Sequence, residues 1–179
     1  GMTMDDTNTV EMTVDGMTTA MISGQIDAAA SWSPNTVTLQ NALGDNYVNL
    51  GTNADFLDSA IFPSSYICTP EYAEANHDIL VRFAQALDKA HDWRAAHPEE
   101  MAKLLAKELD APEDTMLAAV GEADWQTITE VCGDMDAIKT VYETQQGIFL
   151  DNGTITENVP VEDYVLFDVM QEGYDAYSA

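Results

Sequence analysis

The feature that most constrains the fold is a change of apolar periodicity at Pro70. Beyond it, apolar residues recur at intervals of three and four, at Ile79, Phe83, Ala86, Ala90 and Trp93. This spacing places the side chains in one stripe on a long helix. The chain after Pro70 is therefore predicted to be mainly helical.

Three further helices are predicted in this helical part. One begins at Pro98, one begins at Asp134 and ends before the Asn152-Gly153 turn, and one covers residues 165–177. The helix after Pro98 is expected to bury its large apolar side chains, which are Met101, Leu104, Leu105 and Leu109.

The chain before Pro70 has a different pattern, with short apolar or alternating segments between turn residues. Strands are predicted at residues 9–14, 26–32, 47–50 and 65–69. Helices are predicted at residues 16–23, after Asp15 as a cap, and from Pro34 to residue 44, after Ser33. Residues 52–63 are predicted to form a surface loop. Strand, helix and strand in this order favour a parallel βαβ unit and an α/β fold.

The charge of the chain limits its partners. The 179 residues include 32 acidic and 6 basic side chains, for a formal net charge of −26. A bare surface of this charge repels nucleic acid phosphates and anionic lipids. A highly solvated surface and adaptation of the source organism to salt both account for the acidity.

The residues that usually hold metals or catalyse reactions form no known motif. Cys68 and Cys132 lie 64 residues apart without a second Cys or His at ligand spacing, which excludes a cysteine-based zinc site. One disulfide and two free thiols both remain open. His77, His91 and His97 are expected at the surface or at helix ends. We therefore expect no enzyme activity, no metal and no cofactor.

A candidate binding segment lies where a predicted strand ends and a predicted helix begins. Ser31, Trp32, Ser33 and Asn35 occupy this junction. Ligands of open α/β folds gather at the carboxyl ends of strands, and a helix N-terminus offers unpaired N–H groups to an anion. The same residues are equally consistent with a purely structural turn.

An ordered series of motifs resembles one family. The series consists of Gly24-Gln25-Ile26-Asp27-Ala28 followed by Trp32-Ser33-Pro34, then residues 66–73, then Phe83-Ala84 to Ala90 with Trp93 and His97-Pro98-Glu99-Glu100, then Asn152-Gly153-Thr154-Ile155. It is similar to the type 2 periplasmic binding proteins of ABC importers, in the group that binds sulfonates, taurine, nitrate and thiamine precursors.

The resemblance implies a solute-binding protein with two lobes that close on a ligand. About the C-terminal half is expected here, because residues 1–64 match the closing part of lobe two and residues 65–179 match a return to lobe one. Either the chain was cut from a longer protein or it is a naturally shortened relative.

The resemblance also implies a site and partners. Ser31, Trp32, Ser33 and Asn35 become ligand-binding candidates, together with Asp27. The expected ligand is a small anion, the expected partner of the intact protein is an ABC permease, and the expected location is extracytoplasmic. The alternatives are a self-associating module that forms a homo-oligomer and a relative that binds or synthesises a thiamine pyrimidine precursor.

Overall fold

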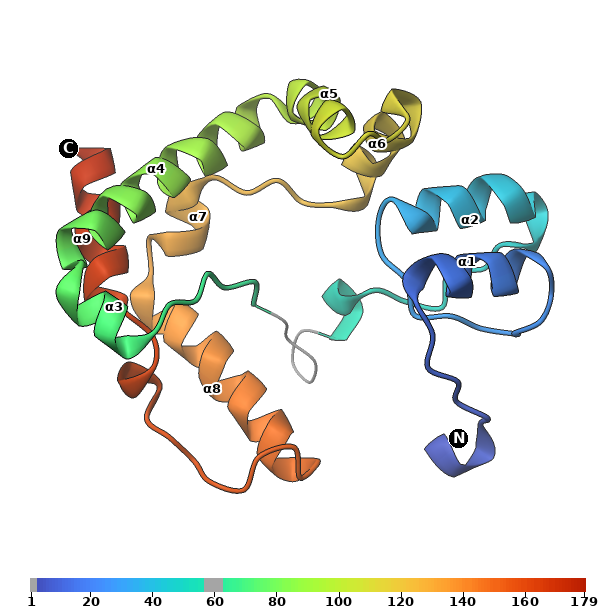
Figure 1. Ribbon diagram of the computed structural model, residues 1–179, viewed down its shortest axis with the longest axis horizontal. Coiled ribbons are helices and arrows are strands. Elements are labelled where there is room, and N and C mark those ends of the chain that lie inside the picture. Colours follow the sequence, from blue (N-terminus) through green and yellow to red (C-terminus); the bar gives the residue numbers. More distant parts are fainter. Residues whose placement is uncertain (1–2, 57–62) are drawn as a thin grey trace. The chain divides into compact units, whose positions relative to one another are not determined.

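The computed structural model describes residues 3–56 and 63–179, which divide into two compact units (Figure 1). The first unit contains residues 1–49 and 99–124, and the second contains residues 50–98 and 125–179. Within the described residues every regular element is a helix. None of these helices is long and apolar enough to cross a membrane. The predicted lobe boundary at residue 64 concerns the intact protein and stays a prediction.

The first unit is built from four α-helices. They are α1 (Val14–Ile22), α2 (Asn35–Leu43), α5 (Pro98–Glu108) and α6 (Glu113–Ala119), with 3-10 turns η1 (Met4–Asp6), η2 (Gly44–Asn46) and η4 (Val120–Glu122). Helix α2 packs against α1 on one side and contacts α6 on another. This arrangement brings residues near 120 to the beginning of α2.

The core of the first unit differs from the predicted one. Ala102 and Ala106 of α5 are buried with Met116 of α6, whereas Leu104 and Leu109 are more than half exposed. The small alanine face allows the close approach that Met116 needs, so the leucines remain outside. The prediction that the large apolar side chains of this helix are buried was therefore wrong.

The described residues of the second unit form five α-helices. They are α3 (Pro70–Ala75), α4 (His77–Ala96), α7 (Ile128–Cys132), α8 (Met135–Asp151) and α9 (Phe167–Ser178), with η3 (Asn53–Phe56) and η5 (Val161–Asp163). Helix α9 lies along α4, and the short helix α7 contacts α4, α8 and α9. Ile128, Val161 and Val169 are its buried apolar residues.

Local capping explains where several helices begin. Asp134, where the sequence predicted a helix to begin, is the cap of α8 and accepts from the amides of Asp136 and Ala137 at 3.0 and 3.1 Å. Thr127 and Glu130 satisfy each other's backbone amides in a capping box at α7. The long helix, the helix from Pro98 and the C-terminal helix are likewise confirmed.

The predicted α/β fold is wrong, because the described residues contain no strand and no parallel βαβ sheet. Residues 9–14, 26–32, 47–50 and 65–69 are irregular except where α1 begins. Thr13 accepts a hydrogen bond from the Gly16 amide, so α1 starts inside the first predicted strand. A strand is stable only when a neighbouring strand takes its backbone hydrogen bonds, and the described residues supply no such neighbour.

Two predicted boundaries also shift. Helix α1 begins at Val14 with Thr13, not Asp15, as its cap, and α2 begins at Asn35 with Pro34 in the cap position. The predicted surface loop at 52–63 contains η3, and its residues 57–62 lie outside the described part of the chain.

Candidate functional site

The predicted binding segment forms the turn that enters α2. The Ser33–Pro34 peptide is cis, and the carbonyl oxygen of Trp32 accepts from the amides of Asn35 and Thr36 at 2.9 and 3.3 Å. Two amides that were expected to be unpaired at this helix end are therefore occupied. These two amides are therefore not open to an anion.

Two hydroxyl groups at this turn bind a carboxylate. Ser33 Oγ and Thr36 Oγ1 both donate to the same oxygen of Glu122, and the Thr36 bond measures 2.6 Å. Glu122 ends the η4 turn, 86 residues beyond Thr36. The sequence predicted that Ser33 caps the helix, and this prediction was wrong. Ser33 and Thr36 instead donate together to one carboxylate oxygen.

The other predicted residues surround this turn. Trp32 exposes 62% of its surface, and Asp27 is exposed. Ser31 Oγ is shielded from solvent and has no hydrogen-bond partner among the described residues. Asn35 Oδ1 accepts from Thr18 Oγ1 of α1 at 3.3 Å, so its side chain fixes α2 to α1.

Sequence reasoning missed Glu122 and Thr36. Thr36 lies one helical turn after Ser33, and this spacing could have identified the hydroxyl pair. Glu122 had no local signal, because it is one of 32 acidic residues and its place depends on the packing of α6 against α2.

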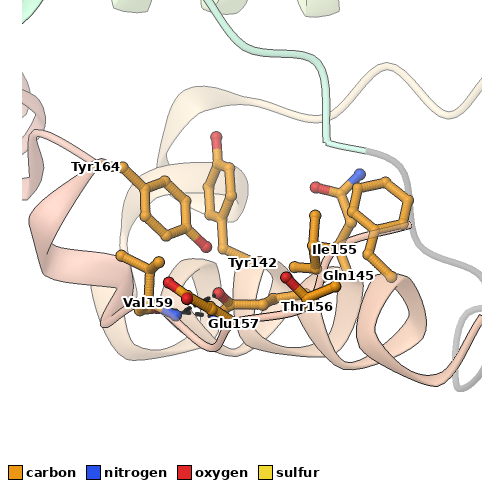
Figure 2. A pocket seen from close by; sticks show the side chains of 9 residues that line it. Tyr142, Gln145, Ile155, Thr156, Glu157, Val159 and Tyr164 are labelled. Carbon is orange, nitrogen blue, oxygen red and sulfur yellow. Dashed lines mark hydrogen bonds between the residues drawn. The ribbon is translucent and has the colours of Figure 1, made fainter. Parts of the chain in front are cut away.

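A concave region lies in the second unit, between α8 and the chain that follows it (Figure 2). Its volume is about 600 Å³, and its lining residues are Tyr142, Gln145, Gln146, Phe149, Ile155, Thr156, Glu157, Val159 and Tyr164. The rings of Tyr142 and Tyr164 meet edge to face at 6.3 Å. None of the five predicted site residues lines this pocket.

Two polar residues of this pocket, Gln146 and Tyr142, already have structural partners. The buried side chain of Gln146 donates to the Val159 carbonyl at 2.9 Å and accepts from the Val159 amide at 2.8 Å. The Tyr142 hydroxyl shares a hydrogen bond with Ser65 Oγ at 2.7 Å. Both contacts hold neighbouring segments in place, which accounts for these residues without a ligand.

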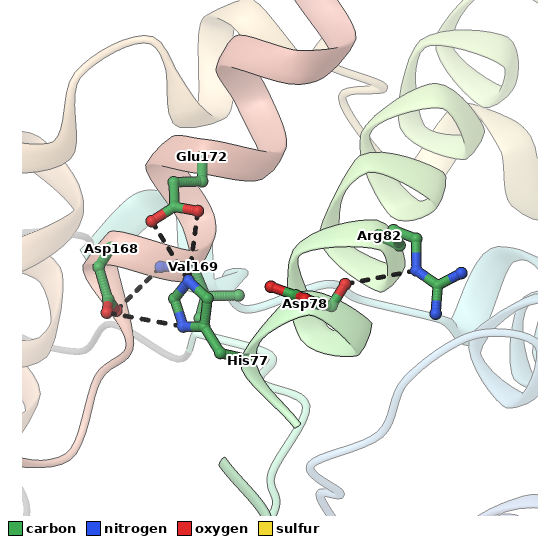
Figure 3. Close-up of polar contacts among 6 residues, drawn as sticks. All are labelled: His77, Asp78, Arg82, Asp168, Val169 and Glu172. Carbon is green, nitrogen blue, oxygen red and sulfur yellow. Dashed lines mark hydrogen bonds and ion pairs between the residues drawn. The ribbon is translucent and has the colours of Figure 1, made fainter. Parts of the chain in front are cut away.

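His77 is the histidine with the most acidic surroundings (Figure 3). Its Nε2 lies 3.2 Å from both carboxylate oxygens of Glu172, and its Nδ1 lies 4.0 Å from Asp168. These contacts join the start of α4 to the first half of α9. Within the described residues no group of three or more His, Cys, Asp or Glu side chains is arranged to hold a metal ion.

An acidic pair lies farther along α4, in which Asp88 is buried and Asp92 is partly exposed. Burial raises the pKa of Asp88, and the nearby charge of Asp92 raises it further. Asp92 accepts from the Tyr177 hydroxyl and from the Ile128 amide, both at 2.7 Å, and these bonds lower its pKa. Asp92 therefore joins α4 to α7 and α9.

The two cysteines are free thiols. Cys68 is exposed, whereas burial raises the pKa of Cys132 to about 11. The disulfide that the sequence left open is not present in the structure.

Comparisons with known proteins identify the family. The model of the family described as NMT1/THI5 like matches residues 1–101. Provisionally named binding proteins of Brucella abortus, Brucella suis and Brucella melitensis are each 33% identical over 107 residues. That alignment covers 60% of this chain and 33% of each relative, so the chain spans about a third of their length.

No solved structure matches the chain at a significant level. The family model covers more than half of the 179 residues and includes the whole turn from Asp27 to Asn35. The resemblance to solute-binding proteins that the ordered motifs indicated is therefore confirmed, and the chain belongs to the NMT1/THI5-like family.

Proposed function

We propose that this chain forms part of the solute-binding component of an ABC-type importer and that its α2 turn contributes to the capture of a small anion. Sulfonates and nitrate are the proposed ligand class. The supporting observation is the pair of hydroxyls, Ser33 and Thr36, that together bind one oxygen of the Glu122 carboxylate. Nitrate and sulfonates resemble that carboxylate in carrying a single negative charge and in offering oxygens that accept hydrogen bonds.

The neighbouring residues give the turn further binding capacity. Ser31 offers a hydroxyl that is shielded from water and unpaired within the described chain. Trp32 offers an exposed aromatic surface to the carbon portion of an organic sulfonate. Asp27 is exposed on the same connection and repels anions, so we assign it a role in excluding wrong ligands or in structure.

The partners and location follow from the same proposal. The family membership supports a small-molecule ligand and no chemistry carried out by this chain. An ABC permease is the proposed membrane partner, and the proposed location is extracytoplasmic. A net charge of −26 opposes contact with nucleic acid.

The proposal makes Glu122 an internal competitor of the ligand. An anion that binds the two hydroxyls must displace this carboxylate and overcome its repulsion. Changing Glu122→Gln removes the charge and weakens the competing hydrogen bonds. If one net bond of about 1 kcal/mol is relieved, the affinity for an anion rises about fivefold.

Isothermal calorimetry with nitrate and with taurine tests this prediction on the chain itself. Glu122→Gln should bind one of these anions more tightly than the wild type, and Ser33→Ala should weaken the binding. Glu113→Gln is the matched control, because Glu113 is an exposed glutamate of α6 in the same unit. The proposed site is refuted if the Glu122 and Glu113 variants have equal anion affinity.

A further inference from the structure

The pocket beside α8 in the second unit has the size and lining of a small-molecule site (Figure 2). Its volume of about 600 Å³ lies within the usual range for such sites, which is about 300–1,000 Å³. Its walls include the aromatic rings of Tyr142, Phe149 and Tyr164 and the aliphatic side chains of Ile155 and Val159. Apolar walls with a few polar groups are typical of sites that bind small organic molecules.

The local sequence builds the pocket before any ligand arrives. One wall is a single face of α8, because residues three, four and seven positions apart lie on the same side of a helix; these residues are Tyr142, Gln145, Gln146 and Phe149. The chain after α8 forms a second wall, and the two hydrogen bonds between the Gln146 side chain and the Val159 backbone hold it against the helix. A ligand therefore meets walls that are already ordered, which lowers the entropic cost of binding.

The charge of the lining favours a cation. Glu157 is the one charged residue among the nine that line the pocket, and within the described residues its carboxylate has no hydrogen bond and no ion pair. None of the nine lining residues is a Lys or an Arg. Lys139 of α8 already pairs with Glu143 and Glu162. A bound cation would supply the partner that Glu157 lacks.

The surroundings of the tyrosines oppose an anion. Burial raises the pKa of Tyr164, and electrostatic repulsion from Tyr142 and Glu143 raises it further. A bound anion would meet the same repulsion from Glu143, together with that of Glu157. The pocket therefore differs in its chemistry from the α2 turn of the first unit, where two hydroxyls donate to a carboxylate.

The paired aromatic rings favour one kind of cation. Figure 2 shows the Tyr142 and Tyr164 rings next to each other, with centroids 6.3 Å apart and planes inclined by 75°. The face of an aromatic ring carries partial negative charge and attracts a cation that lies within about 6 Å of it. Alkyl groups on an ammonium ion add apolar contact area and weaken its hydration, so such an ion gains the most from apolar walls.

We propose that this pocket binds a small organic cation, an ammonium group that carries alkyl substituents. Tyr142 and Tyr164 contact the alkyl groups, and Glu157 balances the positive charge. This site lies within the second unit and is separate from the turn proposed to capture an anion.

Choline and 3,3-dimethyl-1-butanol test the proposal as a matched pair, because they have the same shape and differ in the charge of one central atom. An NMR titration of the chain follows the methyl signal of each probe, at a constant ionic strength that screens diffuse attraction to the acidic surface. Choline should bind about fivefold or more tightly than the neutral alcohol. Equal affinity for the two probes, or no binding of choline, overturns the proposal.

Variants of Tyr164 test whether its ring recognises the charge. Tyr164→Leu keeps an apolar side chain but removes the aromatic face, so it should lower the affinity for choline about fivefold and leave the affinity for the neutral alcohol almost unchanged. Tyr164→Phe keeps the face and should bind choline as the wild type does. An equal loss of both probes in Tyr164→Leu would show that the ring only shapes the pocket, and it would contradict recognition of a cation.

A pair of glutamate variants separates the pocket from the overall charge of the chain. Glu157→Gln should lower the affinity for choline about two- to fivefold, the effect of a partly exposed ion pair. Glu71→Gln is the matched control, because Glu71 is an exposed glutamate of α3 in the same unit and does not line the pocket. Equal affinity in the two variants overturns the proposal, since the attraction then comes from net charge. No anion takes part in these titrations, so their failure leaves the proposed function standing.

Discussion

The packing of α9 against α4 predicts the effect of adding one methyl group at Gly173. A Cβ at this position would lie 2.6 Å from Ala84 Cβ and 3.2 Å from the Gln85 nitrogen. Carbon atoms in good contact lie about 3.5–4.0 Å apart. Helix α9 would therefore have to move by about 1 Å, and overpacking of this kind costs about 1–3 kcal/mol.

Helix propensity acts in the opposite direction. Alanine is more favourable than glycine in a helix interior by about 1 kcal/mol. Gly147 of α8 isolates this effect, because nothing lies within 4 Å of a Cβ built there. We expect Gly147→Ala to raise the free energy of unfolding by about 0.5–1 kcal/mol. Gly173→Ala should be less stable than Gly147→Ala by about 1–3 kcal/mol, the cost of overpacking.

Urea unfolding followed by circular dichroism measures both values. A third variant, Ala84→Gly, removes the nearest atom, so the double variant Ala84→Gly with Gly173→Ala should cost less than the sum of the single changes. The reasoning is refuted if Gly173→Ala is as stable as Gly147→Ala. It is also refuted if the changes at 84 and 173 are strictly additive, because the predicted contact then has no energetic effect.

Two further predictions concern buried titratable groups. Asp88→Asn should stabilise the protein at neutral pH by about 1 kcal/mol, because a buried carboxylate oxygen without a partner is costly. The folded-state pKa of Asp88 is raised, so the destabilisation caused by its charge should disappear as the pH falls through that pKa. The stability advantage of Asp88→Asn over the wild type, measured by urea unfolding, should therefore shrink at lower pH, whereas the difference between the exposed control Asp124→Asn and the wild type should not. The pKa of the Cys132 thiol is about 11, so at pH 8 this thiol should react with a thiol reagent at least about tenfold more slowly than the exposed Cys68. The two rates are measured on the two single-cysteine variants, and equal rates would contradict the burial of Cys132.

The four longest helices after Pro70, α4, α5, α8 and α9, could be predicted because their determinants are local, whereas the short helices α3, α6 and α7 were not predicted. A stripe at Ile79, Phe83 and Trp93 requires only the period of one helix, and the cap at Asp134 depends on amides two and three residues away. The family could likewise be inferred from motifs in order, because such motifs survive whether or not their usual neighbours are present.

The four predicted strands are absent because a strand forms only when a second segment pairs with its backbone. Residues 26–32 and 65–69 have the composition of strands, but each needs a backbone partner at the correct distance. The buried face of α5 also depends on distant residues. Met116 of α6 packs against Ala102 and Ala106 and leaves the leucines exposed.

The candidate site also has a part that the local sequence determines and a part that depends on tertiary packing. The sequence by itself determined that Ser33 lies at a helix start, that Thr36 follows one turn later, and that the chain is strongly acidic. Only the tertiary structure decided which acidic residue meets these hydroxyls, because the packing of α6 on α2 brings Glu122 across 86 residues of chain. Helical periodicity depends on residues that are close in the sequence, whereas a contact between distant residues forms only when the intervening chain has folded.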